Sequence, residues 1–385
     1  ERVNIEADAP PTYYALAGAW LRLGRALGLE GLALLYWVRW LAVGFVAAAV
    51  VGTWAALRAH GVEPLFVRIA APALVAVWPN DLLYGITPDA LALPLGALAF
   101  AALLRLRAGG ASLGLHSGAG LLFGLAFLNK YPAVVYAGLA AGFAGIAVAR
   151  AVRAGTGRDA VLGWGATGFA AALPAGWWLA RNLIFLGSVS GQHRKLVWLG
   201  WSTHGPAEAL AHPLVGASGW PDFALTFLRS FWRGEFVWQG QVQHLAWVDG
   251  VYVAASLVLL GSAALAFRGL GPAERRVDAT AWAILAASVA VLAVLSTLFD
   301  YGVEEGPLSR AHPYLASGRL VAGAWPVFAL LCARGLAAAW ALAPPRAGAI
   351  GRWTSLAALA ALALGSEAWT SATAFTSPWN WFHHP

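Results

Sequence analysis

Long apolar stretches separated by short polar ones run through the whole chain. Ten of them approach the ~20 consecutive apolar residues that a helix needs to cross a bilayer. They are residues 33–57, 64–79, 87–105, 118–131, 132–149, 160–180, 250–267, 279–299, 317–338 and 354–372. The two stretches that meet at Pro132 are short, and they form either a broken pair of helices or one re-entrant unit. The number of spans is therefore uncertain by about two. The pattern predicts an all-α polytopic membrane protein with about ten transmembrane helices.

The composition excludes a soluble globular protein. Of the 385 residues, 60% are hydrophobic and only 11% are charged, against about 25% charged residues in an ordinary soluble domain. The single cysteine, Cys332, can form neither an internal disulfide nor a cysteine-based zinc site. The chain also has no GxGxxG motif before a helix, no P-loop and no HExxH motif, which argues against nucleotide-driven transport and zinc proteolysis.

The net charge of +7 follows the expected membrane topology. Five segments between spans hold 13 of the 25 Lys and Arg residues but only 4 of the 18 Asp and Glu residues: 58–68, 105–117, 150–159, 268–278 and 334–353. The positive-inside rule places these segments in the cytoplasm, so the basic balance does not indicate nucleic-acid binding. The longer polar segments then face outside, and we expect three of them to converge over one outer cavity: 76–90, 181–249 and 300–316.

One amphipathic segment near the start of the chain is expected to lie along the membrane surface. Residues 13–29 are apolar on one face and carry Arg22 and Arg25 on the other, which predicts an interfacial helix within an outer loop, residues 1–32. No repeat or linker divides the sequence, so residues 1–385 are predicted to form a single transmembrane domain. The chain has no methionine and opens at Glu1 without an apolar segment, and we interpret it as N-terminally truncated.

Ionisable residues at membrane depth are costly and are functional candidates for that reason. Four of them fall in or beside predicted spans: Arg39, Lys130, Arg319 and Glu367. A structural ion pair or a side chain that snorkels to the interface is an equally good interpretation of each. Arg319 follows Gly318 at the outer end of a span, where a guanidinium can hold a lipid phosphate; the alternative makes it a structural partner of Asp300 or of a helix end.

The outer segments contain further candidates. Asp81 and Asp89 lie in a turn before a predicted helix. The alternative to a functional role is that Thr87 or Asp89 caps that helix. Lys130 interrupts an apolar run at the outer surface, and a headgroup anchor is the alternative there. Asp300 and His312 lie in the outer segment before Arg319.

The outer loop 181–249 mixes tryptophan, histidine and basic residues. It contains Arg181, Trp232, Arg233 and Glu235, and such a mixture suits a phosphorylated, sugar-bearing ligand because indole faces stack on sugars while arginine binds phosphate. An amphipathic cap that lies on the headgroups is the alternative. The four histidines of the loop lack tight ligand spacing, so they signal a metal site only weakly.

Several short blocks resemble GT-C membrane glycosyltransferases, which include protein mannosyltransferases and the aminoarabinose lipid A transferase, and related uncharacterised bacterial membrane families. Residues 6–14 (EADAPPTYY) resemble the "HPPLYY" entry to the interfacial helix of that class. Further matches follow in order along the chain: GWW at 176–178 with the RN of 181–182 and Gly187, SFWRGEFVW at 230–238, HPYLASGR at 312–319 and NWFH at 380–383.

The resemblance implies a GT-C-like bundle and an inverting transfer of a sugar from a polyprenyl-phosphate donor at the outer face. In that class, an acid early in the first outer loop acts as base, and Arg or Lys residues neutralise the leaving phosphate. The corresponding candidates here are Glu6, Asp8 and Asp89 as catalytic acids and Lys130, Arg181, Arg233 and Arg319 as phosphate ligands. The chain departs from the class in two respects: the first family span is missing, and Asp8 stands where the class has a histidine.

The leading hypothesis is therefore a polyprenyl-phosphate-dependent glycosyltransferase of a bacterial inner membrane, which acts on the outer face. Its partners are the donor lipid and an acceptor of unknown identity, with substrate contacts expected from Asp81, Trp232, Glu235, Asp300 and His312. No cofactor is required, although some members of the class use a divalent cation, for which Asp81, Asp89, Glu235 and Asp300 are conceivable ligands. The alternative is a non-catalytic or transport protein that binds a polyprenyl lipid or glycolipid.

Overall fold

A computed structural model describes residues 8–83, 85–239, 241–305 and 308–379. Within these residues the chain forms fourteen α-helices and only two short strand pairs. The strands are β1 (Ser202–Thr203) with β4 (Phe299–Asp300), and β2 (Val237–Trp238) with β3 (Gln241–Val242), both antiparallel. The all-α prediction is confirmed.

Among the described residues, eight helical segments are long and apolar enough to cross a membrane. They are α2 (Gly31–Ala59), α4 (Asp89–Ala108), α6 (Val134–Arg153), α7 (Gly157–Leu186), α11 (Ala246–Ala266), α12 (Pro272–Leu298), α13 (Trp325–Ala339) together with the 3-10 segment that precedes it, and α14 (Pro345–Phe375). Short 3-10 turns adjoin three of them: η2 (Tyr131–Ala133) before α6, η3 (Phe267–Gly269) after α11 and η4 (Gly318–Ala324) before α13. The chain is an all-α polytopic membrane protein.

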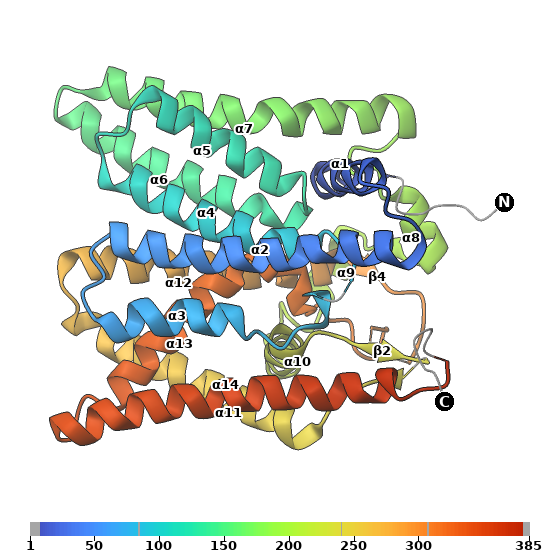
Figure 1. The fold of residues 1–385 in the computed structure, drawn as a ribbon. Helices are drawn as coiled ribbons and strands as arrows, with labels where there is room; N and C mark the ends of the chain where they lie inside the picture. The colour runs from blue at the N-terminus through green and yellow to red at the C-terminus, as the bar shows by residue number, and fades with distance from the viewer. Residues whose placement is uncertain (1–7, 84, 240, 306–307, 380–385) are drawn as a thin grey trace. The chain divides into compact units, whose positions relative to one another are not determined.

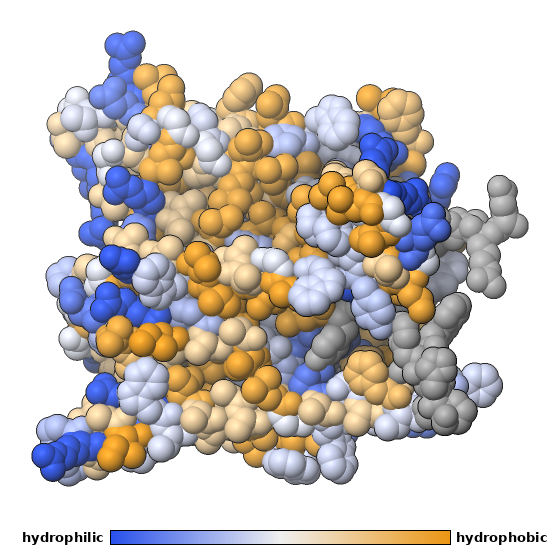
Figure 2. All heavy atoms as spheres, viewed as in Figure 1, coloured by the Kyte–Doolittle hydropathy of each residue, from blue (hydrophilic) through white to orange (hydrophobic). Residues whose placement is uncertain are grey.

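The other two predicted spans form shorter apolar helices, α3 (Leu65–Ala76) and α5 (Leu113–Phe127). The number of spans thus agrees with the prediction within its margin of two. The stretches on either side of Pro132 form two separate helices, α5 and α6. In the face shown in Figure 2, hydrophobic side chains cover the middle of the helices and hydrophilic ones gather near helix ends, as expected for helices that contact lipid.

The chain divides into two compact units. Unit 1 comprises Glu1–Leu41, Leu98–Ala224 and Ala283–Ala316, and unit 2 comprises Ala42–Ala97, Leu225–Trp282 and Ser317–Pro385. The expectation of a single transmembrane domain stays a prediction.

In unit 1, α5, α6 and α7 pack side by side (Figure 1). Gly120 and Gly124 of α5 face α7 at close range, because a Cβ at either position would collide with the backbone carbonyl of Thr167 or Ala171. Two glycines four residues apart allow two membrane helices to approach closely. The tight α5–α7 contact therefore depends on these glycines.

The segment that was predicted to lie along the membrane surface forms α1 (Thr12–Ala26), which is not among the candidate spans. Figure 1 shows α1 almost end-on while α2 runs across the view. Trp20 stacks on Trp37, with ring centroids 4.3 Å apart, and each indole donates to the other residue's carbonyl at 2.8 Å. The Thr12 N–H also donates to the Leu128 carbonyl after α5. This helix begins and ends within three residues of the predicted bounds.

Unit 2 is built around α13, in which every residue from Trp325 to Leu336 is buried. The helix packs against α3 and α11. Arg334, 5% exposed, forms ion pairs with Glu274 at 2.9 Å and Asp278 at 3.2 Å. This contact joins two of the segments that were predicted to share the cytoplasmic side, 268–278 and 334–353. Which side of the membrane they face stays a prediction.

The remaining helices are short and lie in the longest polar loop: α8 (His193–Leu199), α9 (Pro206–Ala211) and α10 (Trp220–Arg233). A single turn, η1 (Asp81–Leu83), precedes α4. Of these elements, α10 and η1 position the candidate site.

Candidate functional site

The site begins where α10 ends. Phe223, Phe227 and Phe231 form the buried face of this amphipathic helix. After Arg233 the chain turns at Gly234, whose φ is +74°, and continues into the β2–β3 hairpin. The helix end, the turn and Glu235 are thus held next to the core of unit 2.

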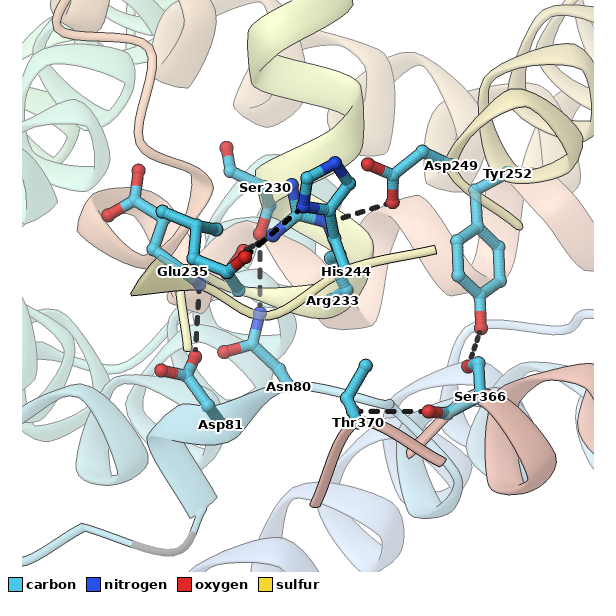
Figure 3. Close-up of polar contacts among 12 residues, drawn as sticks. Asn80, Asp81, Ser230, Arg233, Glu235, His244, Asp249, Tyr252, Ser366 and Thr370 are labelled. Carbon is cyan, nitrogen blue, oxygen red and sulfur yellow. Dashed lines mark hydrogen bonds and ion pairs between the residues drawn. The ribbon is translucent and has the colours of Figure 1, made fainter. Parts of the chain in front are cut away.

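Two other segments of unit 2 meet this turn (Figure 3). The Trp78 indole donates to the Phe231 carbonyl at 2.7 Å, and the buried Asn80 amide lies 3.4 Å from the Ser230 and Phe231 carbonyls. From the other side, the Gly318 N–H donates to the Ser230 hydroxyl at 2.9 Å. Residues 78–80 and Gly318 therefore meet the end of α10. The predicted convergence of segments 76–90, 181–249 and 300–316 over one outer cavity stays a prediction.

Two carboxylates and one guanidinium come together there. The Asp81 Oδ1 accepts a hydrogen bond from the Glu235 N–H at 3.3 Å, and the Glu235 Oε2 lies 3.7 Å from the Arg319 Nε. Arg319 is 48% exposed and Glu235 is 37% exposed, so this ion pair is loose and open to solvent. Burial raises the pKa of the Asp81 carboxyl, with the neighbouring Glu235 charge acting in the same direction and Arg319 against it.

Gly234 is required for this geometry. A Cβ at this position would collide with the Asp81 carboxylate, and the left-handed backbone favours glycine independently. We expect Gly234→Ala to lose about 1 to 3 kcal/mol of stability and to displace Asp81. Thermal unfolding of purified protein measures the loss. Gly250→Ala, at a helical position with open space around it, is the matched control, and equal melting of the two variants would contradict the steric argument.

Arg233 has a different environment from Arg319. Its Nε lies 2.8 Å from the Asp249 Oδ1, and one terminal nitrogen donates to the Gly234 carbonyl at 3.0 Å. Trp232 is buried, stacked on Tyr252 and hydrogen-bonded to the Ser256 hydroxyl at 2.8 Å. These contacts tie the turn to α11. The predicted roles of Arg233 in phosphate binding and of Trp232 in substrate binding stay predictions.

Asp89 begins α4 in the same unit, and its side chain is buried. The Thr87 hydroxyl accepts from the Asp89 N–H at 3.0 Å, so Thr87 acts as a cap at the start of the helix. This agrees with the interpretation in which Thr87 caps the helix. The catalytic role of Asp89 stays a prediction.

Five other predicted site residues belong to unit 1. Asp8 is buried, Lys130 precedes η2, and His312 is exposed. The guanidinium of Arg181 lies over the Trp178 ring, 4.9 Å from its centroid. Since the Trp178 indole donates to the Tyr131 hydroxyl at 3.2 Å, the segments that carry Lys130 and Arg181 lie together.

Asp300, the fifth, was considered as the alternative partner of Arg319. Its carboxylate accepts hydrogen bonds from two nitrogens of Arg310, Nε at 2.9 Å and Nη2 at 2.8 Å. These hydrogen bonds lower the pKa of Asp300 to about 2. Glu6, the remaining catalytic candidate, lies outside the described residues.

Asn80, Ser230, Gly234 and Asp249 also shape the site, although sequence reasoning did not select them. Asn80 and Gly234 are sequence neighbours of residues that were selected. Asp249 is an acidic residue just before a predicted span, and this position could have identified it as a candidate. Among the residues that the structure describes, no three His, Cys, Asp or Glu side chains gather as a metal-binding group.

Comparison of the chain with protein-family models, with curated proteins and with solved structures finds no match.

Proposed function

We propose that this protein is a membrane glycosyltransferase that moves a sugar from a polyprenyl-phosphate donor to an acceptor hydroxyl at the outer face of a bacterial inner membrane. One observation carries the proposal: a turn at Gly234 holds a half-buried carboxylate, Asp81, near a solvent-exposed guanidinium, Arg319. The ordered resemblance of the sequence to GT-C enzymes supports the same class of reaction.

The proposed reaction needs these two groups. The acceptor O–H gives its proton to a carboxylate as its oxygen bonds to the anomeric carbon, and the bond from that carbon to the phosphate oxygen breaks. The electron pair leaves with the polyprenyl phosphate, which gains negative charge. A fixed guanidinium stabilises that charge as it develops.

Asp81 is the base in this proposal. The Glu235 N–H orients its carboxylate oxygen. Burial raises the pKa of Asp81 above the ordinary value for an aspartate, which brings it closer to the pH at which the enzyme works, as an effective general base requires. Arg319 holds the phosphate, with Glu235 beside it as the counter-charge.

We expect the turnover of the wild-type protein to fall on the acid side, because Asp81 is protonated as the pH drops through its raised pKa and no longer accepts a proton. Asp81→Asn should lower the rate about 10²- to 10⁴-fold and abolish this acid limb. Release of polyprenyl phosphate from a labelled donor, measured against pH, tests both expectations.

Glu304→Gln, which removes a carboxylate of unit 1 whose side chain is 76% exposed, is the control and should keep the acid limb. If purified protein binds the donor lipid but releases no polyprenyl phosphate with any acceptor fraction, the non-catalytic lipid-binding alternative is favoured. An Asp81→Asn variant with a normal rate would contradict the assignment of the base.

A further inference from the structure

Near its beginning, α14 carries an arginine whose charge has no partner. Arg352 is half-buried, and its Nε is shielded from solvent without a hydrogen-bond acceptor. Among the residues that the structure describes, no carboxylate pairs with Arg352 and no carbonyl accepts a hydrogen bond from it. Burial thus removes water from one side of the guanidinium and supplies nothing in its place. An anion at the open end of this side chain would compensate the charge.

Aromatic rings hold this guanidinium in place. Its central carbon, Cζ, lies 5.6 Å from the centroid of the Phe66 ring, a cation–π contact between α14 and α3. Phe66 is buried, and the Trp353 ring meets it edge-on, with centroids 4.9 Å apart. Trp353 is itself 41% exposed, as is common for tryptophan at a membrane–water interface. Because the rings position the guanidinium in advance, a ligand loses less free energy in ordering it.

The length of α14 places Arg352 at the depth of the lipid phosphates. The helix has 31 residues, about 46 Å, which exceeds the ~30 Å of bilayer hydrocarbon. Its uncharged stretch runs from Trp353 to Ser366. Arg352 lies about two turns after Pro345 and directly before this stretch, so it falls at the headgroup boundary. In Figure 1, α3 and α14 of unit 2 both begin at the left edge of the view.

The segments around this arginine are basic. Eight arginines but only three acids occur in three segments of unit 2: 58–68, 268–278 and 334–353. The contacts of Phe66 with Arg352 and of Arg334 with Glu274 and Asp278 bring these segments together. The second contact also occupies two of the three acids. A headgroup with a net negative charge is therefore favoured over a zwitterionic one, since each arginine near the surface adds to the attraction.

We propose that Arg352, held against Phe66, binds the phosphate of an anionic phospholipid at the membrane surface. The planar guanidinium can hold two phosphate oxygens, and the exposed side chains of Leu65 and Ile69 on α3 offer apolar contact to the acyl chains. Lipid phosphates line both membrane surfaces, so the site does not depend on the orientation of the protein. It lies at the opposite end of α3 from Asp81 and does not rest on the proposed transferase function.

The test titrates phosphatidylglycerol into the full chain in a neutral detergent and follows the first bound lipid by native mass spectrometry. Arg352→Gln should weaken this binding at least about tenfold, as expected when hydrogen bonds to a charged group are lost. Arg352→Lys keeps the charge but loses the planar fork, and its affinity should lie between the two. Arg346→Gln removes an exposed arginine from the same helix, and this matched control should bind as the wild type does.

Four outcomes would overturn the lipid site. They are unchanged phosphatidylglycerol affinity in Arg352→Gln, an equal loss in Arg346→Gln, equal affinity of the wild type for phosphatidylcholine, and displacement of the lipid by inorganic phosphate at the same concentration. The second would show a diffuse attraction to surface charge, and the last a site for free anions. Thermal melting of each variant separates loss of the lipid from loss of the fold. If Arg352→Gln does not fold, Arg352→Lys decides the test, and a wild-type affinity there would contradict the contact with two phosphate oxygens.

Discussion

Arg319→Ala is expected to lower the rate of sugar transfer about 30- to 1,000-fold, which corresponds to about 2 to 4 kcal/mol of transition-state stabilisation. The Arg319 side chain is 48% exposed, and its Nε lies 3.7 Å from the Glu235 Oε2. Because solvent-exposed ion pairs contribute little to stability, the variant should lose much more rate than melting temperature. Arg319→Lys keeps the charge but loses the planar fork that holds two phosphate oxygens, so a fraction of the rate should remain.

Arg310 provides a matched control for this experiment. Its side chain is 50% exposed and forms ion pairs with Asp300 and Glu304 in unit 1. Arg310→Ala should leave turnover within about twofold of the wild type, since an exposed pair contributes little. Release of polyprenyl phosphate and thermal melting are measured on all three variants. Loss of melting temperature in parallel with loss of rate would make Arg319 a structural residue and end the phosphate proposal.

Arg334→Leu is expected to have the largest effect on stability, about 3 to 5 kcal/mol. The Arg334 guanidinium is 5% exposed and is the shared partner of Glu274 and Asp278, whose carboxylates are also largely buried. Without Arg334, two carboxylates remain in a low-dielectric interior without this cation. The variant should melt at lower temperature and yield less folded protein on gel filtration.

Two companion variants separate charge pairing from packing. Arg346→Leu removes an exposed arginine at the start of α14 and should melt as the wild type does. Arg334→Leu combined with Glu274→Leu and Asp278→Leu should regain most of the stability, because replacing a whole buried ion cluster with apolar residues is often neutral. If the triple variant is worse than Arg334→Leu alone, packing around α13 is the dominant cause.

The helices could be predicted because the apolar composition of each segment by itself indicates whether that segment lies in the membrane. A transmembrane helix satisfies its backbone hydrogen bonds internally, so the length and composition of a segment decide whether it can span. The amphipathic pattern of α1, with Arg22 and Arg25 on its polar face, is equally local. The span count was uncertain at Pro132, where two short apolar stretches meet. In the structure, α3 and α5 are the shorter apolar helices, with 12 and 15 residues.

The site was predicted only in part. Asp81, Glu235 and Arg319 were selected individually, because a charge at an outer helix end is visible in the sequence. Their association could not be predicted, since α11, α12 and the loop before η4 separate Glu235 from Arg319 in the sequence. The contribution of Asp249 was missed because a short-range pattern does not show which charge Arg233 faces.

The sequence by itself determined the class of the protein, its helices and the amphipathic helix α1, because hydrophobic length and period are properties of single segments. The tertiary structure alone decided that Arg310 pairs with Asp300, that Glu235 lies beside Arg319, and that Gly234 brings Asp81 under the same turn. Ion pairs are short-range contacts between positions distant in the chain. Only the packing of helices and turns sets those distances, and no local pattern encodes them.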